Sequence, residues 1–307
     1  MCGLFGFSHY GNGELRDMHS LTRALADQSV IRGTDAAGIA YCHSGNLRIV
    51  KEGKSALQID FKHPDTVRAV MGHTRHSTQG SEKQFWNNHP FPGHVKSTRF
   101  ALAHNGVLWN DAELRKQHRL PKTKIQTDSF VAVQLIEQKR QLNFDSLRYM
   151  AEQVEGSFSF SVLDQHNNLY LVKGDSPLSV LQFPREELYV YASTDEILYR
   201  ALIDSPLFSS LKQGSFQEVP IRTGEILMLA PNGQLERQDF QFRYTTGRSW
   251  WTYGTSASPA SGTSALHDSY IDDLKFLATY QGYEPEIVDR MLSAGFTADE
   301  VEEYLYA

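Results

Sequence analysis

Cys2 is the first residue whose chemistry stands out, because it follows directly after the initial methionine. An apolar run over residues 4–7 comes next, and a strand there would hold the cysteine in place at the end of a sheet. A thiol has a pKa near ~8.5, so it needs a base to act as a nucleophile at neutral pH. An N-terminal residue carries such a base, its own α-amine with a pKa of about 7.7–8.0. We therefore expect Cys2 to be a nucleophile once Met1 is removed, and a chain that retains Met1 to be inactive.

Four polar clusters follow Cys2, at the expected ends of strands or in loops. They are RGTDAAG at 32–38, GHTRHSTQG at 72–80, HNG at 104–106 and TDS at 127–129. Strand ends hold polar groups rigidly, and catalytic and binding sites are commonly built there. The clusters combine a cation, an anion, an amide and glycines with the thiol of Cys2.

Together with MCGLFG at the start and NNHP at 87–90, these clusters resemble the class II glutamine amidotransferase (glutaminase) domain of the N-terminal nucleophile hydrolases. Six motifs occur in that family's order, from Cys2 to about Phe240. The resemblance implies an α+β fold, a four-layer αββα sandwich. It also implies hydrolysis of L-glutamine to glutamate and ammonia through a γ-glutamyl thioester on Cys2. His76 and Gln79 depart from the family pattern, which leaves the branch of the family open.

The same resemblance assigns the oxyanion-binding groups. The side-chain amide of Asn105 and the backbone N–H of Gly106 would stabilise the negative oxygen that forms when Cys2 attacks. Each fixed donor of this kind is worth about 10²–10³-fold in rate. Glycine at the second position allows a close approach that a side chain would block.

Five further residues are assigned to substrate binding by resemblance. Arg75 would bind the α-carboxylate with its forked guanidinium, and Thr78 would add a hydroxyl contact. Asp128 would bind the α-ammonium group, helped by the Gly33 carbonyl, and Arg32 would position the loop around the nucleophile. No metal and no cofactor are expected.

Each motif also has a simpler interpretation. Arg75 and Asp128 alone would more often be an ordinary ion pair, and Asn105-Gly106 alone is most often a hairpin turn. The spacing His73-x-x-His76 is not one of the common zinc spacings, and His73 and His104 are expected to pack or form hydrogen bonds. A papain-like protease is disfavoured because Cys2 lacks that family's local signature.

The composition is that of a packed globular protein. The 307 residues are 40% hydrophobic and 21% charged, with a formal net charge of −6. The overall balance gives no support for a nucleic-acid surface, and neither an apolar run of membrane-spanning length nor a signal peptide is found. We expect a cytoplasmic protein without nucleic-acid or membrane partners. The second cysteine, Cys42, is expected to be a buried small hydrophobe.

Strands, then helices, then strands follow one another along the chain, which favours an α+β domain over alternating βαβ units. Strands are expected over residues 4–8, 36–43, 47–51, 68–73, 100–103, 157–163, 169–172, 179–183, 188–191, 216–219 and 225–229. Helices are expected over 14–29, 145–153 and 195–202, with another capped by Thr127. A loop is expected over 79–97.

Three parts are expected along the chain. Residues 1–243 form the amidotransferase domain, 244–267 have linker composition, and 268–307 form a small three-helix module that is similar to ubiquitin-associated domains. Pro285 would open one tail helix, and the capping box at 297–300 another.

Larger members of the family continue into a synthase that uses the ammonia, and only the linker and tail follow residue 243 here. The acceptor is therefore predicted to be a separate enzyme, docked by the tail, and a homo-oligomer stays open. Two other functions stay open as well: hydrolysis of another γ-glutamyl amide or a small peptide, and a non-catalytic scaffold that binds partners through its helical tail.

Overall fold

The computed structural model describes residues 2–11 and 17–243 and, near the C-terminus, residues 283–294 with the isolated positions 271, 274, 275, 278, 296, 298, 301, 304 and 305. The chain divides into two compact units, Met1–Phe242 and Arg243–Ala307. The expected linker over 244–267 lies outside the described residues. Among the helices that are described, none is both long and apolar enough to cross a membrane.

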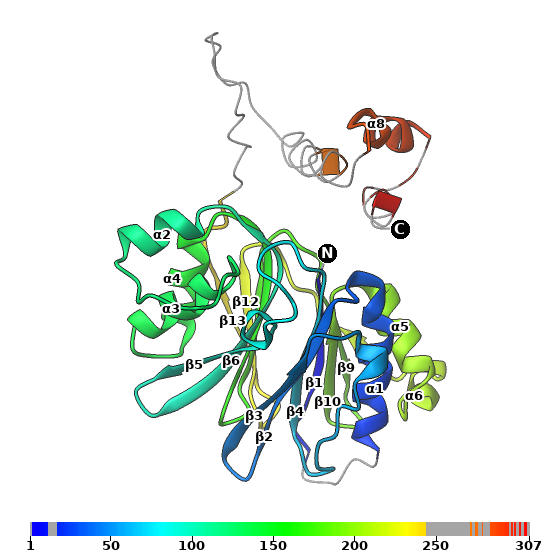
Figure 1. Cartoon of the computed structure of the whole chain (residues 1–307). Helices are drawn as coiled ribbons and strands as arrows, with labels where there is room; N and C mark the ends of the chain where they lie inside the picture. The colour runs from blue at the N-terminus through cyan, green and yellow to red at the C-terminus, as the bar shows by residue number, and fades with distance from the viewer. Residues whose placement is uncertain are drawn as a thin grey trace. The chain divides into compact units, whose positions relative to one another are not determined.

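The first unit is built on two antiparallel sheets (Figure 1). The order in the seven-stranded sheet is β11-β9-β10-β1-β4-β2-β3, so the N-terminal strand lies in the interior of this sheet. Its strands are β1 (Gly3–His9), β2 (Ala36–His43), β3 (Asn46–Glu52), β4 (Ala69–Arg75), β9 (Ser179–Phe183), β10 (Leu188–Ala192) and β11 (Gln217–Glu218).

The second sheet has six strands in the order β13-β12-β8-β7-β6-β5. They are β5 (Phe91–Val95), β6 (Thr98–Leu108), β7 (Gly156–Asp164), β8 (Leu169–Lys173), β12 (Glu225–Leu229) and β13 (Leu235–Asp239). The longest pairing joins β6 to β7, from Phe100 opposite Asp164 to Leu108 opposite Gly156.

Helices cover the outer face of each sheet (Figure 1). On the seven-stranded sheet these are α1 (Met18–Gln28), α5 (Asp195–Ile203) and α6 (Phe208–Lys212). On the six-stranded sheet they are α2 (Asp111–Gln117), α3 (Phe130–Gln138) and α4 (Phe144–Gln153). The layers therefore follow the order helix, sheet, sheet, helix, and the expected four-layer αββα sandwich is confirmed.

The alternation of side chains along β1 explains why this short strand is buried on both faces. Leu4 packs in the apolar core between the two sheets, whereas Phe5 and Phe7 pack in the core under the helices of the first sheet. Successive side chains of a strand point to opposite faces. Each large apolar side chain that is fully buried contributes about 1.5–3 kcal/mol, so β1 anchors the residue that precedes it.

Some expected elements differ from the structure. The strand expected over 100–103 runs on to Leu108 as part of β6, because pairing with β7 continues past the HNG cluster. The expected loop over 79–97 contains β5. The helix expected to be capped by Thr127 begins at Phe130 after Ser129. Helices α2 and α6 and strand β13 were not expected.

The second unit is described in part. Helix α8 (Glu286–Ser293) begins directly after Pro285, as expected from the position of that proline. Its Val288 packs in a small apolar cluster with Leu274, Ala278, Val301 and Leu305. Residues 295, 297, 299 and 300, which include most of the expected capping box, lie outside the described residues.

Candidate active site

Cys2 lies at the start of β1, beside the end of β4. Gly3 pairs with Thr74 and Leu4 with His73, which places Cys2 next to the residues that follow β4. The half-buried thiol donates a hydrogen bond to the backbone carbonyl of His76 with an Sγ to O distance of 3.7 Å. Strand pairing therefore holds Cys2 in a fixed position, as the sequence predicted.

The electrostatic surroundings of Cys2 connect it to two of the predicted site residues. Burial raises the pKa of the Cys2 thiol, the Arg75 guanidinium lowers it, and the Asp128 carboxylate raises it. Both charged groups are therefore close enough to act on the sulfur. Because burial is the largest effect, the thiol needs a base before it can attack a substrate.

Arg32 and Gly33 support the nucleophile and the end of β4. Arg32 Nε donates to the backbone carbonyl of Cys2 at 2.9 Å. A Cβ atom on Gly33 would lie 2.4 Å from the carbonyl carbon of Arg75, and Asp35 N donates to the Arg75 carbonyl at 3.0 Å. Glycine is required at position 33 because the two backbones touch there.

Arg75 is the last residue of β4 and is almost fully buried, with 3% of its surface exposed. Its Nη1 donates to Asn88 Oδ1 at 2.7 Å, and its Nη2 donates to the carbonyls of Gln79 and Gly80 at 2.6 and 2.7 Å. A guanidinium has five N–H donors, so the Nε–H and one Nη1–H remain. In the described part of the chain no ion pair joins Arg75 to Asp128, so the simple ion-pair interpretation does not hold.

Asn105 lies inside β6, opposite Ser159 of β7, and is fully buried. Neither its Nδ2 nor its Oδ1 has a hydrogen-bond partner. A buried amide without a partner costs about 1–3 kcal/mol, and such groups in native proteins need an explanation. The next residue, Gly106, has φ 133°, and a Cβ atom there would lie 2.0 Å from the Ser157 carbonyl oxygen.

The alternation of the strands shows that Cys2, Arg75 and Asn105 all face the layer between the two sheets. Leu4 and Met71 belong to the apolar core of that layer, as do Ala101 and Ala103 of β6. Cys2 is two residues from Leu4, Arg75 is four from Met71, and Asn105 is two from Ala103, so each shares the face of its neighbour. The thiol, the guanidinium and the amide therefore lie in one layer.

Asp128 is tied to the end of the same strand that carries Asn105. Its Oδ2 accepts a hydrogen bond from Leu108 N at 2.6 Å, and its Oδ1 lies 3.1 Å from Ser129 Oγ. Ser129 Oγ is also 2.8 Å from Nδ1 of His104. The sequence had not singled out Ser129 or His104 for the site, although both belong to the quoted clusters. Serine and threonine are common at the starts of helices, so Ser129 and Thr127 are explained by helix capping alone. The sequence therefore gives no separate signal for the contact of Ser129 with Asp128.

Three histidines lie buried near these groups. His73 forms a hydrogen bond with the backbone. Its Nε2 lies 2.9 Å from the His104 carbonyl oxygen and donates to it. Burial lowers the pKa of His73 to about 3 and also lowers the pKa of His89 and His104. All three are therefore neutral at pH 7. Among the described residues, no group of three or more His, Cys, Asp and Glu side chains is arranged to hold a metal ion.

Thr78 stands apart from the other predicted site residues. It is exposed in the loop between Arg75 and Gly80, and the structure gives it no hydrogen bond within the described part of the chain. The loop itself is held by Ser77 N, which donates to Asp35 Oδ2 at 2.7 Å.

Comparison with known proteins shows which proteins the chain is similar to. A family model described as a glutamine amidotransferase domain matches residues 73–200. Glutamine–fructose-6-phosphate aminotransferase (isomerizing) of Bacillus licheniformis is 32% identical over 192 residues, which cover 59% of this chain and 30% of that protein. The protein of the same name from Staphylococcus epidermidis is 30% identical over 190 residues with the same coverage.

Solved structures agree with the fold. Glutamine phosphoribosylpyrophosphate amidotransferase from B. subtilis, complexed with ADP and GMP, matches 79% of this chain and 50% of its own, with a TM-score of 0.61 and 20% identity. A structure titled as the allosteric regulatory enzyme of purine biosynthesis matches 91% of this chain and 58% of its own, with a TM-score of 0.61 and 18% identity.

The chain matches the glutamine amidotransferase domain over residues 73–200 and is related to the aminotransferases named above, which agrees with the resemblance to glutamine amidotransferases drawn from the motifs. It spans about 30% of the length of the curated relatives that it matches. The matched region begins in β4 at His73 and ends in α5 at Arg200, so it contains Arg75, Asn105 and Asp128.

Proposed function

We propose that this protein hydrolyses L-glutamine to glutamate and ammonia with Cys2 as the nucleophile. The observation that carries the proposal is the buried side-chain amide of Asn105, which has no partner and faces the same layer as Cys2 and Arg75. An unpartnered donor in a buried site is a candidate for binding charge that develops during a reaction. The match of residues 73–200 to the glutamine amidotransferase domain supports the choice of substrate.

In the proposed mechanism Met1 is first removed, so that the α-amine of Cys2 is free to accept the thiol proton. The thiolate attacks the carboxamide carbon of glutamine, and the resulting oxyanion accepts hydrogen bonds from Asn105 Nδ2 and Gly106 N–H. The proton held by the amine passes to the leaving nitrogen, and ammonia departs. Water then hydrolyses the γ-glutamyl thioester, which releases glutamate and restores the thiol.

The same proposal gives the substrate-binding residues their roles. Arg75 binds the α-carboxylate with Thr78 at the edge of the site, and Asp128 with the Gly33 carbonyl binds the α-ammonium group. Arg32 positions the nucleophile through the Cys2 carbonyl. The surroundings of Asp128 suit a cation, because the residue is buried, with 7% of its surface exposed, and no cation pairs with it in the described part of the chain.

We further propose that the ammonia passes to a separate acceptor enzyme in the cytoplasm. Residues 1–243 would be the catalytic domain, and residues 268–307 a helical module for binding a partner. The names of the curated relatives, which are aminotransferases, support use of the ammonia in synthesis.

The proposal is tested by comparing Cys2→Ala with Cys42→Ala. Cys42 is the matched control, since it is buried, its thiol donates to the Asp164 carbonyl at 3.0 Å, and burial raises its pKa to about 12. Glutamate release from glutamine, asparagine and glutathione is measured, and intact mass shows whether Met1 is removed. We expect Cys2→Ala to abolish release from glutamine and Cys42→Ala to retain it. Parental activity in Cys2→Ala, or in protein that fully retains Met1, would refute the proposed nucleophile.

A further inference from the structure

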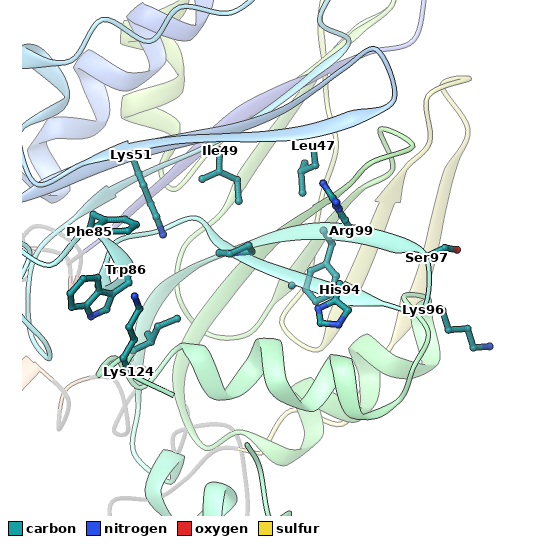
Figure 2. Close-up of a pocket in the computed structure, with 14 residues that line it drawn as sticks. Leu47, Ile49, Lys51, Phe85, Trp86, His94, Lys96, Ser97, Arg99 and Lys124 are labelled. Carbon is teal, nitrogen blue, oxygen red and sulfur yellow. The ribbon is translucent and has the colours of Figure 1, made fainter. Parts of the chain in front are cut away.

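A groove of about 1100 Å³ opens at the edge of the sandwich, and Cys2 is not among the residues that line it (Figure 2). One wall is the edge strand β3, which contributes Leu47, Ile49 and Lys51, and the other is the hairpin of β5 and β6. Leu47 and Ile49 also pack against the apolar core between the sheets. One wall of the groove therefore borders the layer in which the candidate active site lies.

The charge of the groove is opposite in sign to that of the whole chain. Four cationic side chains line it, and no lining residue is acidic, although the formal net charge of the protein is −6. Figure 2 shows Lys51, Trp86 and Lys124 at one end and Lys96 and Arg99 at the other. A further basic residue of the lining, His94, contacts a carboxylate outside the groove, with Nδ1 3.2 Å from Glu137 Oε1.

Apolar and aromatic surface accompanies this charge. Phe85 is a large exposed side chain with 60% of its surface accessible, and Trp86 lies next to it with ring centroids 5.4 Å apart. Lys124 Nζ lies 4.2 Å from the centroid of the Trp86 ring, which holds a cation at the aromatic end. Exposed aromatic side chains next to cations are typical of surfaces that bind a partner.

The backbone on both sides of the groove suits an extended chain. Within the described residues, β3 ends the order of one sheet and β5 ends the order of the other. An edge strand presents unpaired N–H and C=O groups, to which an extended segment can add. Side chains on one face of such a segment recur about every 6–7 Å, so successive acidic residues could reach cations that are spread from one end to the other. A single small anion would contact one end only.

The groove also reaches the candidate active site through one short chain of hydrogen bonds. Lys51 Nζ donates to the carbonyls of Asn88 and Pro90 at 2.5 and 3.0 Å. Asn88 Oδ1 in turn accepts from Arg75. A partner segment that lies along β3 would therefore contact Lys51, whose side chain holds residues 88–90 in place.

We propose that this groove binds an extended, acidic segment of a partner protein, with apolar side chains between Leu47, Ile49 and Pro92 and carboxylates on the cations at the two ends. The proposal concerns binding alone, so it can fail or hold whether or not the protein hydrolyses glutamine.

The test uses full-length protein and a fluorescein-labelled ten-residue peptide with glutamate at every second position and leucine and serine between them. Binding is followed by fluorescence anisotropy for the parent, Arg99→Glu, Lys124→Glu and the double variant. Exposed ion pairs are individually weak, so we expect each single reversal to weaken binding about 3–10-fold and the double variant about 10–100-fold. Lys212→Glu, in α6 outside the groove, is the matched control and should stay within about twofold.

Three outcomes would overturn the proposal. The first is no binding at peptide concentrations up to about 1 mM. The second is equal binding of a peptide with lysine in place of glutamate. The third is loss of affinity in only one of the two single variants together with full displacement by inorganic phosphate at matched ionic strength, which would assign the groove to a small anion. Circular dichroism of each variant shows that a loss of binding does not come from unfolding.

Discussion

Replacing Asn105 with alanine is expected to slow glutamine hydrolysis while leaving the first unit as stable as before. The Asn105 amide is fully buried, and both of its polar atoms lack partners. Alanine therefore removes an unsatisfied group that costs about 1–3 kcal/mol, which offsets the packing lost with the side chain. The loss of one oxyanion donor should lower the rate by about 10²–10³-fold, or ~2.7–4 kcal/mol in the barrier.

Asn87 provides a matched control within the same unit, because it is also an asparagine with 0% exposure. Its Nδ2 donates to the Ser81 carbonyl at 3.2 Å and to Gln126 Oε1 at 3.0 Å, and its Oδ1 accepts from Gln126 N at 2.9 Å. Alanine at position 87 removes three hydrogen bonds of about 0.5–1.5 kcal/mol each, or ~1.5–4.5 kcal/mol in total. The two variants should therefore differ in stability although the substitution is the same.

Differential scanning calorimetry measures the stabilities, and coupled detection of glutamate measures the rates. In a unit of this size 1 kcal/mol shifts the midpoint by about 2–4 °C, so Asn87→Ala should melt about 3–18 °C below Asn105→Ala. The reasoning is refuted if Asn105→Ala loses as much stability as Asn87→Ala and still hydrolyses glutamine within about tenfold of the parent rate. Asn105 would then be an ordinary structural residue.

Two further predictions follow from close packing and from burial. Gly33→Ala should lower the free energy of unfolding by about 1–3 kcal/mol, because the new Cβ would meet the backbone of Arg75; urea unfolding that matches the parent would contradict this. The unfolding free energy should also fall on acidification, because the pKa of buried His73 is lowered to about 3. The unfolded chain takes up a proton below pH ~6.5 that the folded chain does not bind, so stability rises with pH between these values. His73 alone should contribute ~2 kcal/mol of loss between pH 7 and pH 5, and His89 and His104 act in the same direction. Equal urea midpoints at the two pH values would exclude this effect.

Elements with a strong local pattern could be predicted from the sequence. The apolar run of β1 and the stripe of α3 have the periods of a buried strand and a buried helix, and both were expected close to their positions. The failure at the HNG cluster has a physical reason. Asn-Gly favours a turn locally, but β6 continues through Asn105 and Gly106 because both pair with β7, about 50 residues later in the chain. Long-range pairing of this kind leaves no local signal.

Strand β5 was missed for a related reason. Pro92 and Gly93 stand in its middle, and both residue types argue against a strand in the interior of a sheet. The structure places β5 at the edge of its sheet, where it pairs only with β6 among the described strands, and a proline is tolerated there because its missing N–H can face away from the partner. The residue types alone do not show that a strand lies at an edge.

The candidate site shows the same division between residue identity and arrangement. The order of the motifs was sufficient to select Cys2, Arg75, Asn105 and Asp128. It could not show that Arg75 donates to the carbonyls of Gln79 and Gly80, since these contacts depend on the path of a loop. Nor could it show that Asn105 lacks partners, because that depends on what the opposite sheet places beside it.

The contacts of Asp128 explain how its carboxylate can bind a cation. Oδ2 accepts from Leu108 N and Oδ1 accepts from the Ser129 hydroxyl, and both of these donors are neutral groups. His104 lies next to Ser129, with Nδ1 2.8 Å from its Oγ, and burial lowers the pKa of His104, so this ring is neutral as well. Within the described part of the chain no cationic side chain forms an ion pair with the carboxylate, so a substrate ammonium group would supply the opposite charge together with a charge-assisted hydrogen bond.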